Sequence, residues 1–211
     1  MGDFMDFFDL HCDTLTECMD DGDSLLKNER DIDFERGKIF GRWNQVFAVF
    51  IPDSMDDSLV ESYFDSACDF YLSELKKKGD FFPILSAEDV RGHSRGVMLA
   101  MESSRGVGSL ERLEKLYERG LRLITLTWNH KNRAAGGCDE GGGLTDWGRE
   151  LVSKMEKLGI VTDVSHLSDR SFYDLCEFSD APFIASHSDA RAVHNEVRSL
   201  TDEQIKIIIE R

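Results

Sequence analysis

Two residues with metal-binding side chains stand close together near the start of the chain. His11 and Asp13 are separated only by Cys12 and follow an apolar, aromatic run that ends at Leu10. Because side chains alternate along a strand, residues two positions apart project from the same face. Imidazole nitrogen and carboxylate oxygen both bind zinc and related divalent ions. The pair is a candidate metal clamp, although by itself it also fits a solvated strand end.

Three further residues of these types follow other apolar runs. Glu102 comes after Gly-Val-Met-Leu-Ala-Met, His166 after Ile-Val-Thr-Asp-Val-Ser, and His187 after Pro-Phe-Ile-Ala-Ser. In parallel α/β folds the carboxyl ends of the strands form the rim of the active site, so these residues are expected at one mouth. Five ligands exceed the needs of one tetrahedral ion, whereas a carboxylate that bridges two ions about 3.5–4 Å apart accounts for them. The predicted metal ligands are His11, Asp13, Glu102, His166 and His187.

The elements that must position these residues are short apolar runs that alternate with amphipathic segments. The predicted strands are Phe4–Leu10, Gln45–Ile51, Val97–Met101, Leu121–Thr127, Ile160–Val164 and Pro182–Ser186. The clearest predicted helices are Asp57–Lys78, Ser109–Arg119, Thr145–Leu158 and Ser168–Phe178, and a last helix begins at Thr201. This alternation predicts an α/β protein with a mostly parallel sheet, either doubly wound or closed as a (β/α)8 barrel.

Composition excludes several classes of partner. Lys and Arg number 25 against 41 Asp and Glu, which gives a net charge of −16 and no basic surface for nucleic acid or anionic membranes. No run approaches the roughly 20 apolar residues of a membrane span, and the chain starts without the features of a signal peptide. The five cysteines contain no CxxC pair, so neither a disulfide framework nor a zinc ribbon is expected. We expect a cytoplasmic protein.

A glycine-rich tract, Gly136–Gly143, is the most unusual stretch of the sequence. It lacks the Lys-Ser/Thr ending of a phosphate-binding loop, and no GxGxxG follows a strand. Nucleotide binding therefore loses most of its support, and the tract is predicted to be a mobile loop.

The motifs around the candidate ligands resemble those of the membrane dipeptidase (renal dipeptidase) family, peptidase family M19. The resemblance implies a TIM-like barrel with two zinc ions, in which His11 and Asp13 hold one ion, His166 and His187 hold the other, and Glu102 bridges them. It implies a zinc-dependent dipeptidase in which a hydroxide shared by the ions attacks the peptide bond of a dipeptide. The similar segments are Asp9-Leu10-His11-Cys12-Asp13-Thr14, Met101-Glu102, Leu123-Ile124-Thr125-Leu126-Thr127, Asp163-Val164-Ser165-His166, Ser186-His187-Ser188-Asp189-Ala190-Arg191 and Arg198-Ser199-Leu200-Thr201-Asp202-Glu203.

The resemblance also assigns a substrate-binding residue. In the family, an arginine eleven residues after the last metal histidine binds the substrate carboxylate, and Arg198 occupies that position here. A guanidinium group suits a carboxylate because it donates two parallel hydrogen bonds. Without the resemblance, Arg198 reads as a surface arginine at the start of a helix.

Two local departures from the family pattern affect the site. Ser103 follows the predicted bridging Glu102, where the family usually has glycine. Many members carry a histidine directly after the Thr-Leu-Thr strand to polarise the scissile carbonyl, whereas this chain has Trp128-Asn129-His130. Trp128 could donate its indole N–H, or His130 could reach the site, and the sequence does not choose between them.

The family chain is longer, and its catalytic acid/base aspartate lies on a later strand, so that residue is expected beyond Arg211. We expect residues 1–211 to form a single barrel domain that lacks its C-terminal quarter, with about six βα units. Either the chain is a truncated product or another polypeptide completes it. Because of the open sheet edges, the chain is expected either to associate, for example as a homo-oligomer, or to carry disordered segments.

Two rival functions remain open on the sequence alone. The first is a metal-dependent amidohydrolase for another small amide, although the usual His-x-His of its first strand is absent. The second is a noncatalytic fragment that binds metal or peptide without the acid/base residue. Both keep the metal ligands, so hydrolysis of dipeptides distinguishes them from the dipeptidase.

Overall fold

The computed structural model describes residues 6–77 and 81–211, in which the strands form one parallel sheet. The sheet order is β1-β2-β4-β5-β6-β7, and the short β3 pairs with β4. This order follows the chain without a reversal, whereas a doubly wound sheet reverses at a switch point. The chain therefore has the winding of a (β/α)8 barrel. The strands are β1 (Asp6–Asp9), β2 (Arg42–Phe50), β3 (Phe82–Pro83), β4 (Arg95–Glu102), β5 (Leu121–Thr125), β6 (Val161–Asp163) and β7 (Phe183–Ile184).

All six predicted strands are present, with ends that differ by a few residues. Of the predicted first strand, Phe4 and Met5 lie outside the described residues, as does Lys78 at the end of the first long helix. The sequence analysis did not predict β3, which pairs only two residues with β4. A two-residue strand that contains a proline carries no periodic pattern to detect.

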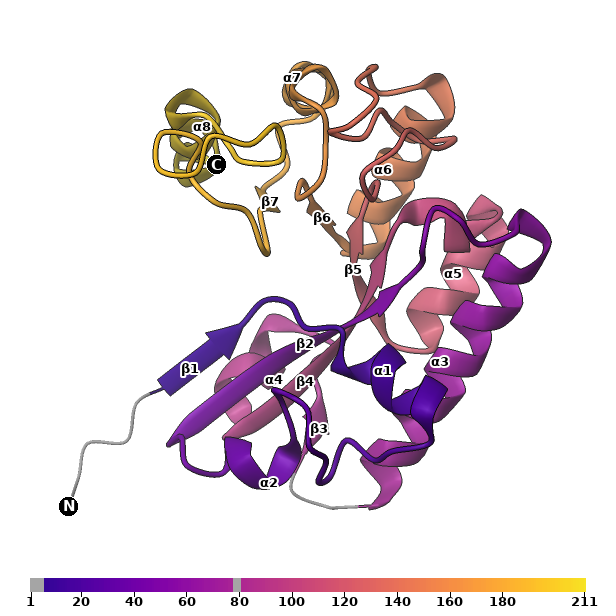
Figure 1. Ribbon diagram of the computed structural model, residues 1–211, viewed down its shortest axis with the longest axis vertical. Coiled ribbons are helices and arrows are strands. Elements are labelled where there is room, and N and C mark those ends of the chain that lie inside the picture. Colours follow the sequence, from indigo (N-terminus) through magenta and orange to yellow (C-terminus); the bar gives the residue numbers. More distant parts are fainter. Residues whose placement is uncertain (1–5, 78–80) are drawn as a thin grey trace.

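The helices connect consecutive strands and cover one side of the sheet (Figure 1). Predicted N-caps are confirmed, since Ser109 and Thr145 each accept a hydrogen bond from the third residue of the following helix. Gly159 closes its helix with φ 78°, as a C-terminal glycine does. The helices are α1 (Thr14–Asp21), α2 (Phe34–Gly37), α3 (Asp57–Lys77), α4 (Ala87–Gly92), the 3₁₀ helix η1 (Ser104–Val107), α5 (Leu110–Glu118), α6 (Asp146–Leu158), α7 (Asp169–Phe178) and α8 (Asp202–Glu210).

The two faces of the sheet pack differently. Between the sheet and the helices lies a large apolar layer, which includes Phe47 and Leu99 of the sheet and Leu113 of α5. We call this layer the outer core. The opposite face carries a small separate cluster of Val46, Ala48, Ala100 and Leu123, which we call the inner cluster.

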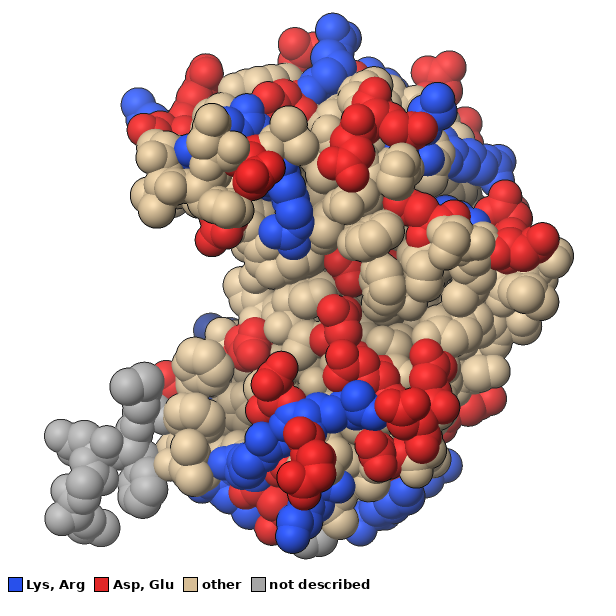
Figure 2. Space-filling view, in the orientation of Figure 1, with Lys and Arg blue, Asp and Glu red and all other residues tan. Residues whose placement is uncertain are grey.

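The sheet curves so strongly that its two edges approach each other at their carboxyl ends. His11 follows β1 and His187 follows β7, and the centroids of their rings are only 3.7 Å apart. Figure 2 shows the molecule hollowed on one side, between the part built from β1–β4 and the part built from β6–α8. Within the described residues, no helix has the length and apolar content needed to cross a membrane, and the five cysteines are all free.

Candidate metal centre

The register of the sheet places polar side chains from three strands at one level. Glu102, the last residue of β4, pairs with Phe50 of β2 and with Thr125 of β5. Thr125 pairs in turn with Asp163, the last residue of β6. Residues in one such row point to the same face of the sheet. Glu102 and Asp163 therefore lie on the two sides of Thr125 in one row above the inner cluster, and both are buried.

The carboxylate of Glu102 lies between three imidazole rings. Its Oε2 is 3.5 Å from Nε2 of His11. Its Oε1 is 3.1 Å from Nε2 of His166 and 3.3 Å from Nε2 of His187. Asp13 adds a second carboxylate, with Oδ1 3.4 Å from Nε2 of His11. The structure thus brings together all five predicted ligands.

Arg198 lies at the same centre although it comes from the loop before α8. Its Nη2 donates to Nε2 of His166 across 3.1 Å. This position excludes the interpretation of Arg198 as a surface arginine at a helix entrance. The guanidinium group stands at the edge of the histidine cluster.

The hydrogen bonds that His166 and His187 make through Nδ1 leave their unprotonated Nε2 atoms facing each other. Nδ1 of His166 lies 2.7 Å from Oδ1 of Asn129, and Nδ1 of His187 lies 2.7 Å from Oγ of Ser186. When Nδ1 carries the proton, Nε2 of a neutral imidazole carries a lone pair. The two Nε2 atoms are 2.9 Å apart and both face Oε1 of Glu102. Lone pairs and a carboxylate at these distances repel each other, so the donor set fits a cation.

Electrostatics favour the protonation states that metal ligands require at Glu102 and His166, but not at His11. Burial alone would raise the pKa of Glu102, but the close contacts with His166 and His187 and the charge of His11 hold it far below its ordinary value. Burial lowers the pKa of His166, which keeps this ring neutral. Burial also acts to lower the pKa of His11, but the hydrogen bond with Asp13 and the charge of Glu102 hold it above 6.5.

Backbone strain is concentrated beside the ligands. Ser103, next to Glu102, has φ 81°, and His166 itself has φ 66°. These are the two non-glycine residues with positive φ in the described part of the chain. Such conformations cost free energy and persist where the surrounding structure enforces them, commonly at functional sites. The glycine that the family usually carries after the bridging glutamate suits the backbone at Ser103.

The glycine-rich tract helps to hold the strained backbone of His166 in place. The sequence predicted a mobile loop for this tract, whereas the structure shows a loop that packs tightly. The backbone N–H of Cys138 donates to the carbonyl oxygen of His166 across 2.9 Å. A Cβ atom on Gly136 would lie 2.1 Å from the carbonyl oxygen of Gly141, and one on Gly137 would lie 2.4 Å from that of Asn129. The glycines allow the loop to pack tightly against the strained backbone of His166.

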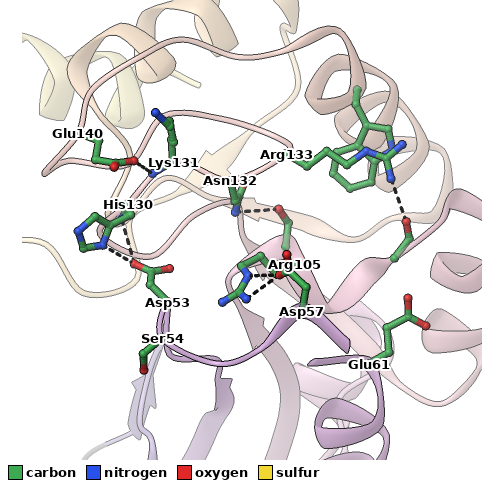
Figure 3. A pocket seen from close by; sticks show the side chains of 13 residues that line it. Asp53, Ser54, Asp57, Glu61, Arg105, His130, Lys131, Asn132, Arg133 and Glu140 are labelled. Carbon is green, nitrogen blue, oxygen red and sulfur yellow. Dashed lines mark hydrogen bonds and ion pairs between the residues drawn. The ribbon is translucent and has the colours of Figure 1, made fainter. Parts of the chain in front are cut away.

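A cavity of about 810 Å³ lies beside the centre, at the ends of β2, β4 and β5 (Figure 3). None of the five predicted metal ligands lines it. Its charged side chains pair mainly with one another, since Asp53 binds His130 across 2.7 Å and Asp57 binds Arg105 across 2.7 Å. The first pair holds the loop between β5 and α6 to the loop after β2, and the second holds η1 to the start of α3.

The structure places Trp128 and His130, the two candidates for polarising the scissile carbonyl, in different surroundings. The ring of His130 is turned into the rim of the cavity, where Asp53 binds it (Figure 3). Trp128 lies inside the centre, with its ring centroid 6.2 Å from that of His166 and packed against Phe50. Of the two, only Trp128 is beside the histidine cluster.

Three residues of the centre were missed by sequence reasoning. Asn129 and Ser186 each hold one histidine through its Nδ1. Asp163 is fully buried and accepts hydrogen bonds from both Thr125 and Ser186. An aspartate inside an otherwise apolar strand was the available signal for Asp163, because a buried carboxylate needs a reason to be there.

Comparison with known proteins places this arrangement among peptidases. The pattern of the membrane dipeptidase family (peptidase family M19) matches residues 3–211. The solved structure of the dipeptidase AC, a metallo peptidase of family M19, has a TM-score of 0.88 and 26% identity, and the match covers 98% of this chain and 70% of that one.

Two further relatives match this chain to different extents. A metallo peptidase from Rhodobacter sphaeroides, solved with a phosphinate mimic of the dipeptide L-Ala-D-Ala, has a TM-score of 0.86 and 24% identity over 99% of this chain and 72% of its own. An uncharacterized protein from Acinetobacter calcoaceticus, described by its place in the PQQ-III 3′ region, is 32% identical to this chain. The match covers 58% of this chain and 42% of that relative. The full-length family match, together with the shared fold, shows that this chain belongs to the membrane dipeptidase family, peptidase family M19.

Proposed function

We propose that this protein is a dipeptidase whose centre holds two zinc ions. The supporting observation is the way in which Glu102 divides its neighbours: Oε2 faces His11, and Oε1 faces His166 and His187. Asp13 joins the His11 side. His11 and Asp13 would hold one ion, His166 and His187 would hold the other, and Glu102 would be shared between them, so every ligand has a role. Membership of a metallopeptidase family already implies a metal cofactor, while the identity and number of the ions belong to the proposal.

Two divalent ions in such a centre supply a nucleophile from water at neutral pH and polarise the carbonyl under attack. The residues of this chain do the rest. Glu102 stays ionised and fixes the spacing of the two sides. Arg198, beside His166, binds the free carboxylate of the substrate, because its guanidinium group matches a carboxylate in two-point contact. A carboxylate held next to the ions places the preceding peptide bond at them, which selects dipeptides over longer chains.

The comparisons support this substrate class. The Rhodobacter sphaeroides relative was solved with a mimic of a dipeptide, and the relative with 26% identity is a dipeptidase. The ring of Trp128 lies beside His166, with centroids 6.2 Å apart, and its indole offers an N–H donor. We propose Trp128, and not His130, as the group that takes the place of the family's carbonyl-polarising histidine.

The first test is metal content. Residues 1–211 are purified without chelator, supplied with Zn²⁺, and subjected to elemental analysis, and two ions per chain are expected. His166→Ala should lose metal, whereas His93→Ala is the matched control, because His93 stacks on Phe82 away from the centre. A content that stays at one ion after zinc addition, or a Glu102→Ala variant that keeps both ions, contradicts the two-ion centre.

The second test is hydrolysis of a dipeptide panel. It is measured on residues 1–211 and on a version that continues past Arg211 to the length of the solved relatives, since the chain spans 70–72% of those proteins. The longer version should cleave dipeptides and leave tripeptides and cyclic amides intact. Cleavage of cyclic amides instead would replace the dipeptidase by the amidohydrolase function.

A further inference from the structure

Asp163 is a buried carboxylate that contacts no positively charged side chain within the described residues. Its side chain accepts four hydrogen bonds, and all four donors are neutral. They are Thr125 Oγ1 at 2.7 Å, the backbone N–H of Ser165 at 3.0 Å, the backbone N–H of Ser186 at 3.0 Å and Ser186 Oγ at 2.6 Å. Burial of a carboxylate without a cation in direct contact is costly, so its place in the fold calls for a function.

The direction of these hydrogen bonds can be deduced from the chemistry of the groups. An ionised carboxylate only accepts, so the hydroxyl of Ser186 must give its single proton to Oδ2 of Asp163. The same hydroxyl oxygen lies 2.7 Å from Nδ1 of His187 and can only accept there. His187 must therefore carry its proton on Nδ1. Its Nε2 is left with a lone pair, directed at Oε1 of Glu102.

We propose that Asp163 and Ser186 are positioning residues that fix the tautomer of His187 and so prepare its Nε2 to bind metal. This inference rests on the proposed metal centre. Partners of this kind typically change metal affinity by about tenfold to a hundredfold. The relay is Asp163–Ser186–His187, with the hydroxyl in the middle. A nucleophilic serine would need the histidine in the middle, so the same three residue types do not form a hydrolytic triad here.

Replacement of Asp163 by asparagine gives a sharp test, because the surroundings decide how the amide must sit. Oδ1 of Asp163 accepts from two backbone N–H groups, those of Ser165 and Ser186, so the amide oxygen has to occupy that position. The NH₂ group then takes the place of Oδ2 and donates to Ser186 Oγ. The hydroxyl proton of Ser186 is released to donate to His187 Nδ1. The ring responds by carrying its proton on Nε2, which blocks the metal-binding lone pair.

The experiment compares Asp163→Asn, Ser186→Ala and Ser186→Thr with Ser188→Ala, a matched control on the other side of His187. Among the described residues, Ser188 Oγ has a hydrogen bond only with Ser165 Oγ, at 3.4 Å. Ser186→Ala leaves Asp163 with three of its four hydrogen bonds, so the fold should persist. The first readout is the ¹⁵N NMR spectrum of the histidine side chains in metal-free protein, with His187 assigned from a His187→Gln variant. The second readout is Zn²⁺ affinity, measured by competition with a chelator.

Asp163→Asn should move the His187 proton from Nδ1 to Nε2 and weaken Zn²⁺ binding by up to about a hundredfold. Ser186→Ala should weaken binding by about tenfold, and Ser186→Thr, which restores the hydroxyl, should recover most of the affinity. Ser188→Ala should match the unaltered chain. An unchanged His187 tautomer in Asp163→Asn, or equal affinities of Ser186→Ala and Ser188→Ala, would overturn the relay. Failure of the unaltered chain to bind Zn²⁺ would instead overturn the proposed metal centre, and the tautomer spectrum remains informative in that case.

Discussion

The outer core and the inner face of the sheet contribute differently to stability and to the candidate site. The outer core packs the sheet against the helices with large apolar side chains such as Phe47, Leu99 and Leu113. The inner cluster is small, and the row above it carries Glu102 and Asp163. Burial of large apolar surface supplies most of the stability of a domain, whereas buried carboxylates cost stability unless they have partners. The fold is therefore held by one face and leaves the other free for chemistry.

Truncation of the outer core should give the largest effect. Leu113→Ala, at a fully buried position in α5, should lower the free energy of unfolding by about 2–5 kcal/mol. Leu59→Ala is the matched control in α3, where the side chain is 57% exposed, and it should cost well under 1 kcal/mol. Urea unfolding measures both. If the contrast between the two faces is correct, Leu113→Ala should leave the Zn²⁺ affinity of the folded protein unchanged.

The opposite pattern is expected at Arg198, which faces the centre. Arg198→Met should weaken dipeptide binding by roughly tenfold to more than a hundredfold, because a hydrogen bond to a charged group is worth about 1.5–3 kcal/mol. Calorimetric titration of zinc-loaded protein with a dipeptide measures this loss. Arg170→Met is the control, since Arg170 binds Asp174 on α7. Dipeptide affinity that is equal in the two variants would remove Arg198 from the substrate site.

Strain on the inner face should be open to relief. Ser103 has φ 81° and ψ 113°, a conformation that glycine adopts without the Cβ penalty. Ser103→Gly should therefore raise the free energy of unfolding by about 1 kcal/mol, measured by urea unfolding. Ser103→Ala, which keeps the Cβ atom, should give no such gain. Stabilisation by both variants would trace the effect to the hydroxyl and not to the backbone.

The smallest effect is expected at the cavity rim, outside both regions. The hydrogen bond with Asp53 raises the pKa of His130 above 6.5. Because the folded-state pKa is raised, the pair stabilises the fold fully below about pH 6.5 and loses this contribution as pH rises through the raised pKa. An NMR titration of His130 should show a midpoint above 6.5 that falls in Asp53→Asn. Zn²⁺ affinity should not respond, and a change in it would connect the rim to the metal centre.

The sequence predicted those features that depend on local patterns. Six of the strands could be found because each is an apolar run with polar ends, and the candidate metal ligands could be found because they follow such runs. The short β3 has no such pattern, and α1 lacks one because Thr14–Asp21 is mostly polar. The interpretation of the glycine-rich tract as a mobile loop was wrong about its packing, since flexibility and close approach both select glycine.

Other parts of the site depend on contacts that no local pattern records. Ser186 meets Asp163 through the pairing of β6 with β7, and Asn129 meets His166 across loops that follow different strands. The sequence separation in these pairs exceeds any helical or strand period, so only the tertiary fold brings them together. The different positions of Trp128 and His130 likewise depend on a distant residue, because Asp53 in the loop after β2 binds His130.

The stacked rings of His11 and His187 have a consequence for folding. They follow the first and the last strand, so nearly the whole chain must be ordered before they meet. Closing so long a loop carries an entropy cost, and the two proposed ions, joined through Glu102, would offset it in the way that a covalent cross-link does. Metal would then bind late in folding, and it would slow the separation of the two edges of the sheet. The proposed ions would therefore stabilise the folded state as well as take part in the reaction.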